Sequence, residues 1–217
     1  MGIVDGVDRY NVMIKKNRRW ALNGLEVLAL LSLAALAATA QHTTLQLDPT
    51  QTSVQYTLGD VLHTVHGTFQ LDHGSLQFEL SSGKISGEIV VNAKSGDSGS
   101  GMRDRKMHKE VLESDRYPEI AFRPDRVEGS VAGQGKSSVR IHGMFNIHGV
   151  DREIEVPADV EMTPGHWTAA VHFTVPYAKW GMKNPSTLFL RVEDSVQIDL
   201  AAAGTATEQA KAPNSTR

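Results

Sequence analysis

The sequence contains no cysteine among its 217 residues, so no disulfide framework can stabilise the fold. It also has no excess of positive charge, because 22 Lys and Arg residues stand against 25 Asp and Glu residues. That balance disfavours a nucleic-acid-binding protein. The chain does have 40% hydrophobic residues, enough for one globular domain whose stability comes from its core.

Motifs of common catalytic sites are also missing. The sequence has no Gly-x-Ser-x-Gly elbow, no phosphate-binding loop and no metal-binding motif of paired histidines on a helix. On an extended strand, His142 and His148 would lie about 20 Å apart, and His63 and His66 would point to opposite faces. We therefore expect no enzyme, no metal site and no cofactor.

Residues 1–40 have the composition of a secretory signal peptide. Four Lys and Arg residues within positions 15–19 precede an apolar run over residues 27–38, and Ala38-Thr39-Ala40 follows as a cleavage motif. We expect cleavage after Ala40, translation from Met1 or Met13, and a periplasmic or secreted protein. A membrane anchor is the alternative, but the run is closer in length to a signal sequence. No cysteine follows to carry a lipid.

Without residues 1–40 the chain has 17 Lys and Arg against 22 Asp and Glu, a formal charge of −5. This net charge disfavours phosphate backbones and anionic membrane surfaces as primary partners. We expect no nucleic-acid partner and no stable membrane insertion after cleavage, and the protein to be a monomer or homodimer.

Alternation of apolar and polar residues dominates from about Thr44 to Ala201. From Trp167 to Val175 every odd position is apolar, which predicts a strand with one buried face. Turns are expected at 72–74, 81–83, 133–135, 148–151 and 164–165. This all-β pattern predicts consecutive antiparallel strands in a sandwich or a barrel, and periodicity alone does not choose between them. Residues 202–217 lack the pattern and are expected to form a disordered tail.

In one segment the apolar residues change from the alternation of a strand to the spacing of a helix. From Met102 to Glu113 the apolar residues Met107, Val111 and Leu112 follow helical spacing, and preceding serines could cap a helix. Tyr117-Pro118 then favours extended backbone and a return to strand. The pattern predicts a short amphipathic helix, which could close an end of the sheet structure or serve only as a connection.

Four motifs in order carry a resemblance to a known family. They are Arg103-Asp104 after a Ser-rich loop, the segment from Tyr117 to Phe122, the segment from Gly143 to Ile154, and the segment from Phe173 to Met182. In this combination the chain resembles the YceI-like family over about residues 44–200. The resemblance implies a lipocalin-like antiparallel β-barrel of about eight strands, with the short helix covering one end. It also implies a domain at 41–201 that binds a polyisoprenoid or isoprenoid quinone in an apolar interior.

Site residues follow from that resemblance and from the inward faces. The expected ligand-binding residues are Tyr56, Phe69, Ile89, Met107, Val111, Leu112, Phe122, Phe145, Phe173 and Trp180. At the rim, Arg103, Asp104 and Tyr117 are expected to anchor the helix, although Arg103 and Asp104 could instead meet a polar head group. The alternative is a filled barrel or sandwich that acts as a protein-interaction module without a lipid.

Overall fold

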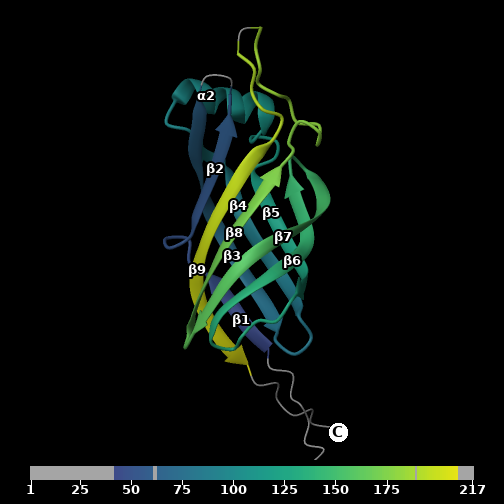
Figure 1. Ribbon diagram of the computed structural model, residues 1–217. Coiled ribbons are helices and arrows are strands. Elements are labelled where there is room, and N and C mark those ends of the chain that lie inside the picture. The colour runs from purple at the N-terminus through teal and green to yellow at the C-terminus, as the bar shows by residue number, and fades with distance from the viewer. Residues whose placement is uncertain (1–41, 61–62, 189, 210–217) are drawn as a thin grey trace, which may run out of the picture. The chain divides into compact units, whose positions relative to one another are not determined.

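The computed structural model describes residues 42–60, 63–188 and 190–209, which form an antiparallel barrel with a helical segment at one end (Figure 1). The expected signal peptide at 1–40 lies outside the described residues. The strands are β1 (His42–Leu47), β2 (Ser53–Gly59), β3 (Thr64–Glu79), β4 (Lys84–Asp97), β5 (Glu119–Glu128), β6 (Gly135–Ile147), β7 (Val150–Thr163), β8 (His166–Val175) and β9 (Val196–Gln209).

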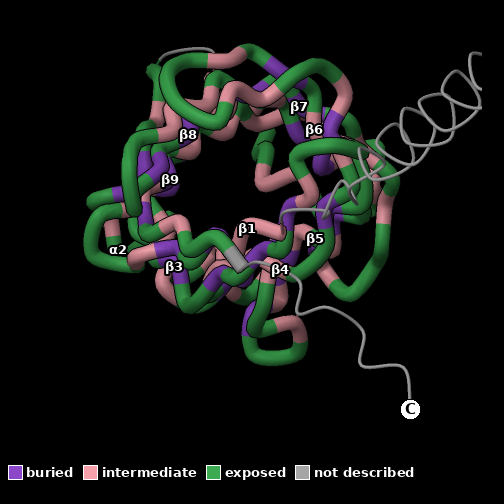
Figure 2. The backbone as a smooth tube through the Cα atoms, turned by 90° about the horizontal axis from the view of Figure 1, so that it is seen from below, coloured by how far each residue is buried: buried purple, intermediate pink, exposed green. Residues whose placement is uncertain are grey.

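The ring closes because β3 pairs with β4 as well as with β2. From β2 the order runs through β9, β8, β7, β6 and β5 to β4, so the strands enclose an interior (Figure 2). β1 and β2 share one position between β3 and β9: β2 pairs with residues 64–69 of β3, and β1 with residues 75–79. The barrel therefore has eight strand positions, as expected from the resemblance, and the sandwich is excluded.

The predicted alternation is confirmed in β8. Trp167, Ala169 and Val175 are buried, and the even positions between them are exposed. Two core clusters form from such inward faces. One cluster contains Leu76, Phe78 and Trp167, and the other contains Phe145 and Val175 beneath the helical segment.

Some strands are longer than the turn residues predicted. The turn expected at residues 72–74 lies inside β3, where the register with β4 shifts between Leu71 and His73. A bulge bends a strand without ending it, which a strand wrapping around a barrel requires. Gly74 also packs against Leu47 of β1, and a Cβ there would lie 2.9 Å from its Cδ1. The glycine therefore marks close packing rather than a chain reversal.

The helical segment is shorter and less regular than predicted. α2 (Gly101–Lys106) is α-helical, and η1 (Met107–Val111) continues it as a π-helix. Ser100 at the N-cap makes no side-chain capping bond, contrary to expectation. Glu113 then takes a φ of 46° and ends the segment. No helix in the described ranges is long and apolar enough to span a bilayer.

The prediction of a disordered tail from residue 202 is wrong for its first part. β9 continues to Gln209, pairing with β8 through Thr205 and with β1 from Leu47 to His42. Ala202 is buried and lines the cavity. A Cβ on Gly204 would collide with the carbonyl oxygen of Gln46, so this glycine marks a close approach of two backbones. Residues 210–217 lie outside the described part.

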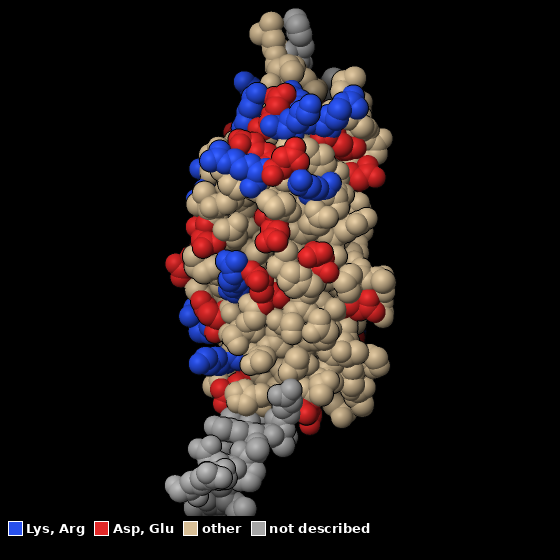
Figure 3. Space-filling view, turned by 180° about the vertical axis from the view of Figure 1, so that it is seen from behind, with Lys and Arg blue, Asp and Glu red and all other residues tan. Residues whose placement is uncertain are grey.

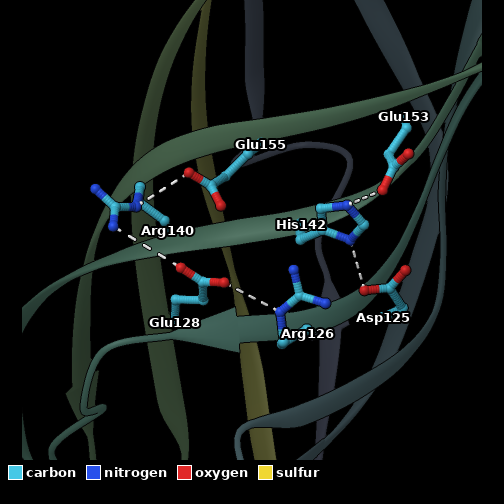
Figure 4. A network of polar contacts seen from close by, with 7 residues as sticks. All are labelled: Asp125, Arg126, Glu128, Arg140, His142, Glu153 and Glu155. Carbon is cyan, nitrogen blue, oxygen red and sulfur yellow. Dashed lines mark hydrogen bonds and ion pairs between the residues drawn. The ribbon is translucent and has the colours of Figure 1, made fainter.

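The outer face of β5, β6 and β7 carries a network of charged side chains (Figure 4). His142, with a side chain only 14% exposed, has Nδ1 2.8 Å from Asp125 Oδ1 and Nε2 2.7 Å from Glu153 Oε1. A neutral imidazole has one N–H and could donate to only one of these carboxylates. The hydrogen bond to Asp125, and next that to Glu153, raise the pKa of His142.

This raised pKa predicts a pH-dependent stability. The stabilisation from protonated His142 is fully present below the ordinary histidine pKa of about 6.5 and is lost as pH rises through the raised value. His142→Gln should flatten that decline when the thermal unfolding midpoint is followed against pH. The double variant Asp125→Asn/Glu153→Gln should do the same. An unchanged slope in both variants would assign the pH dependence to another group.

Candidate ligand-binding cavity

The barrel encloses a cavity of about 360 Å³. Its wall is built from the inward side chains of β2 to β9, from α2 and η1, and from the loop after β8. Apolar side chains form almost all of it. Many of them, including Phe69, Phe122, Phe173 and Ile198, are only partly buried although they point inward, because they border this space.

The cavity runs along most of the barrel. Leu76, Trp167 and Ala202 line its deep end, and Met107, Val111 and Leu112 line the end under η1. Eight residues separate Trp167 from Val175 on β8, which corresponds to about 26 Å along the strand. An elongated apolar molecule fits such a space better than a compact one.

Charged side chains are confined to the helical end of the cavity. Asp60, Arg103, Asp104 and Lys106 line it there, and no charged residue lines the deep half. Glycines make room at this end: a Cβ on Gly96 would lie 2.5 Å from the terminal methyl carbon of Met107, and one on Gly67 would collide with the Tyr56 ring. Close packing of these side chains therefore depends on two strand glycines.

Ser98 is the centre of the contacts that hold the helical segment. Its backbone N–H and its hydroxyl donate to Asp104 Oδ1 at 2.9 and 2.6 Å. Arg103 Nε donates to the Ser98 hydroxyl at 3.2 Å, and its terminal nitrogen donates to the Ser98 carbonyl at 2.9 Å. Ser98 is only 8% exposed. Arg103 and Asp104 thus both contact Ser98, which directly precedes the loop into α2.

His108 adds a second attachment on η1. Its Nδ1 lies 3.0 Å from the Ser114 hydroxyl and its Nε2 lies 3.0 Å from the Gly96 carbonyl. Lys106 Nζ donates to the Pro185 carbonyl at 2.6 Å, which ties α2 to the loop after β8. The segment is therefore fixed to β4 on one side and to that loop on the other.

Two tyrosines, Tyr56 and Tyr177, contribute uncharged polar hydroxyl groups to the cavity wall. Burial raises the pKa of Tyr56, with a contribution from the charge of Asp104. Burial, followed by the charges of Asp194 and Glu193, raises the pKa of Tyr177 to about 12. The Tyr177 hydroxyl donates to the Glu193 carbonyl at 2.5 Å. Both side chains stay protonated at neutral pH.

The structure brings most predicted site residues together. The wall includes nine of the ten predicted ligand-binding residues, together with Arg103 and Asp104. Trp180 is the exception, since it lies behind the wall with its ring 6.1 Å from the Phe145 ring and the Arg152 guanidinium over it at 5.1 Å. Residues that line the wall but were not predicted as site residues include Lys106, Ile154, Tyr177, Met182, Leu190 and Ile198.

Tyr117 lies outside the cavity wall. Its ring centroid is 4.5 Å from that of His148, in the turn between β6 and β7. A Cβ on the neighbouring Gly149 would collide with the Tyr117 ring, and Gly149 has a φ of +72°. Tyr117 therefore packs the chain after η1 against this turn. In the described ranges, no group of three or more His, Asp or Glu residues could hold a metal ion.

A closed antiparallel barrel around an elongated apolar cavity defines the class of lipocalin-like ligand-binding barrels. The model of the YceI-like domain matches residues 45–203, and the chain belongs to this family. No curated protein matches the chain.

Solved structures with the same fold share little sequence with it. BcnA of Burkholderia cenocepacia is 16% identical, with a TM-score of 0.61, over 73% of this chain and 99% of that one. A polyisoprenoid binding domain from Saccharophagus degradans, described as implicated in plant cell wall breakdown, is 15% identical, with a TM-score of 0.57, over 78% and 99%. The YceI protein of Campylobacter jejuni is 13% identical, with a TM-score of 0.54, over 66% and 86%.

The contacts of Ser98 predict how the helical segment opens. Ser98→Ala removes the hydroxyl that joins Arg103 to Asp104, and the local opening free energy should fall by about 1 kcal/mol. Hydrogen exchange of amides in residues 101–111 should accelerate while exchange in β6 and β7 stays unchanged. Ser100→Ala is the matched control, because Ser100 makes no capping bond. Equal acceleration in both variants would contradict the role of Ser98.

Proposed function

We propose that the protein is a periplasmic or secreted carrier that holds an isoprenoid lipid in the barrel cavity. The observation that carries this proposal is the distribution of polarity in the cavity, which has an apolar deep half and charged groups only at the helical end. A lipid of this kind is insoluble in water, and a concave apolar container lets it cross an aqueous compartment. Membership of the YceI-like family and the fold shared with a polyisoprenoid binding domain support the same ligand class.

The energetics are sufficient without charged contacts. Each 100 Å² of alkene surface removed from water contributes about 2.5 kcal/mol before ordering costs. Small-molecule cavities typically measure about 300–1,000 Å³, so 360 Å³ lies near the lower limit. The cavity therefore favours a chain of a few isoprene units, and a longer chain requires the helical segment to move aside.

The cations at the helical end use only some of their donors in contacts within the protein. Arg103 donates to Ser98 through Nε and one terminal nitrogen, and Lys106 donates to the Pro185 carbonyl. A guanidinium has five N–H donors and an ammonium has three, so donors remain for the oxygen atoms of a quinone or of a phosphate head group. The proposed ligand class therefore includes isoprenoid quinones and polyprenyl phosphates. We propose no catalytic role and no further cofactor, and a monomer or homodimer as the working form.

The test begins with protein exported to the periplasm of a bacterial host. Native mass spectrometry should show a discrete added mass, and organic extraction should release it as an isoprenoid. A mass of the protein alone that persists after incubation with isoprenoid quinones would overturn the proposal and favour the protein-interaction module. The intact mass also shows whether cleavage occurs after Ala40.

A matched pair of variants connects the ligand to the cavity. Val111→Asp places a carboxylate in the apolar wall and should reduce retention of the isoprenoid at least tenfold, because a charge cannot be solvated there. Val150→Asp makes the same change at a residue that is 45% exposed and outside the wall, and it should retain the ligand as the wild type does. Thermal unfolding of both variants separates loss of ligand from loss of fold. Equal retention in a folded Val111→Asp variant would place the ligand elsewhere.

A further inference from the structure

Positive charge is concentrated where the cavity meets α2. We define the mouth surface as residues 101–111, 179–188 and 190–192, which comprise α2, η1 and the loop after β8. These residues carry seven Lys or Arg and two Asp or Glu, whereas the other described residues carry eight and twenty. On the face drawn in Figure 3, Lys and Arg gather toward the end that bears α2 in Figure 1, with Asp and Glu side chains among them. The mouth surface is therefore basic, whereas the rest of the described chain is acidic.

The mouth surface is continuous across its two chain segments. Lys106 Nζ donates to the Pro185 carbonyl at 2.6 Å, and Lys183 Nζ lies 2.6 Å from Glu110 Oε2. The other acid of the surface, Asp104, accepts from Ser98. Both acidic groups are thus engaged, and Arg105 and Lys109 are exposed.

Acidic residues that border the mouth surface are engaged with other groups. Asp115 pairs with Lys94 at 2.9 Å, and Glu113 Oε1 lies 3.3 Å from His148 Nε2. Asp194 accepts from the Asn184 side chain at 2.7 Å. Of these contacts, the pair with Lys94 sets a positive charge against a carboxylate.

The mouth surface also exposes large apolar side chains. Leu188 is 90% exposed and Met102 is 75% exposed, the two highest values among the large hydrophobic residues of the described part. Leu188 lies in the loop after β8, and Met102 lies in the first turn of α2. Exposed apolar side chains among cations are the combination that binds the interface of an anionic bilayer, where the apolar groups enter and the cations meet head groups.

We propose that the mouth surface docks on an anionic membrane surface, so that the isoprenoid enters and leaves the cavity there. This inference rests on the proposed function. Lys106, Met107, Pro185, Thr187 and Leu190 belong to the mouth surface and also line the cavity. A docked protein would therefore hold the cavity mouth against the bilayer, and the lipid would pass between them without crossing bulk water.

The net charge of the protein orients this encounter. A negative membrane surface repels the acidic barrel and attracts the mouth surface. One orientation of the protein at the membrane is therefore favoured. Binding is peripheral and reversible, because two exposed apolar side chains cannot insert the protein stably.

The test measures sedimentation of the exported protein with phosphatidylcholine vesicles that contain or lack phosphatidylglycerol. The protein should sediment only with the anionic vesicles, and 1 M salt should abolish this by shortening the Debye length to about 3 Å. Arg105→Glu/Lys109→Glu should weaken binding at least 25-fold, since each basic residue near such a surface contributes about fivefold. Leu188→Asp should also weaken it.

Two control variants make the same kinds of substitution outside the mouth surface, to test whether the position of the changed residues determines binding. Lys84→Glu/Lys136→Glu makes the same change in net charge at the start of β4 and of β6, far from the mouth surface. Leu80→Asp changes a leucine that is 41% exposed in the turn between β3 and β4. Both should bind anionic vesicles within about twofold of wild type, because their positions face away from the bilayer.

Uptake of an isoprenoid quinone from anionic vesicles gives the second readout. Arg105→Glu/Lys109→Glu should slow uptake while the protein, once loaded, retains its ligand. Wild-type protein that carries an isoprenoid but binds no anionic vesicles would overturn docking and leave the proposed function intact. Equal loss in the mouth and control variants would overturn it too, as would binding by the mouth surface to an acidic protein in place of vesicles.

Discussion

Closure of the ring between β3 and β4 is the constraint on which the rest of the structure depends. With eight strand positions, the interior is wide enough for a column of side chains or for one slender ligand. β1 and β2 complete the ring in tandem, because each supplies only part of the length that β3 and β9 offer. Leu45, Leu47, Leu71 and Phe78 pack in the core cluster at the deep end of the cavity without lining it. The division of one strand position into two allows a sealed end and a cavity in the same barrel.

The helical segment closes the other end with limited packing of its own. No residue of α2 or η1 is buried, whereas Leu112 directly after η1 is buried at 8% exposure. Polar contacts of Ser98, His108 and Lys106 attach it to the barrel instead. Elements with few buried apolar contacts open at low free energy, and π-helical turns recur at functional sites. The segment is thus built to open more easily than the strands beneath it, as a cavity near the lower size limit requires.

The sequence was most informative where one face of a strand is buried. The alternation in β8 predicted the inward residues, and nine predicted ligand-binding residues line the wall. Trp180 lies outside the cavity lining, and its position after Pro176 did not reveal this, because an aromatic residue there can pack behind the wall as well as in it. Met182 and Leu190 lie in an irregular loop, where no period marks the inward side. Gly204 gave no apolar signal because a close approach to the backbone of Gln46 leaves no room for a side chain there. The sequence does not distinguish Ser98 from the other serines of its loop, because its role depends on the contact with Asp104 in the folded protein.

Net charge was the least informative feature, because it averages over surfaces with opposite roles. A formal charge of −5 disfavours an anionic membrane as a partner for a uniformly charged sphere. In this barrel the cations gather on α2, η1 and the loop after β8, which surround the entrance to the cavity. Screening limits each charge to a range of about 8 Å at physiological salt, so a docked bilayer would experience the mouth surface much more than the distant barrel. In the proposed docking, local charge would therefore outweigh the net charge of the protein.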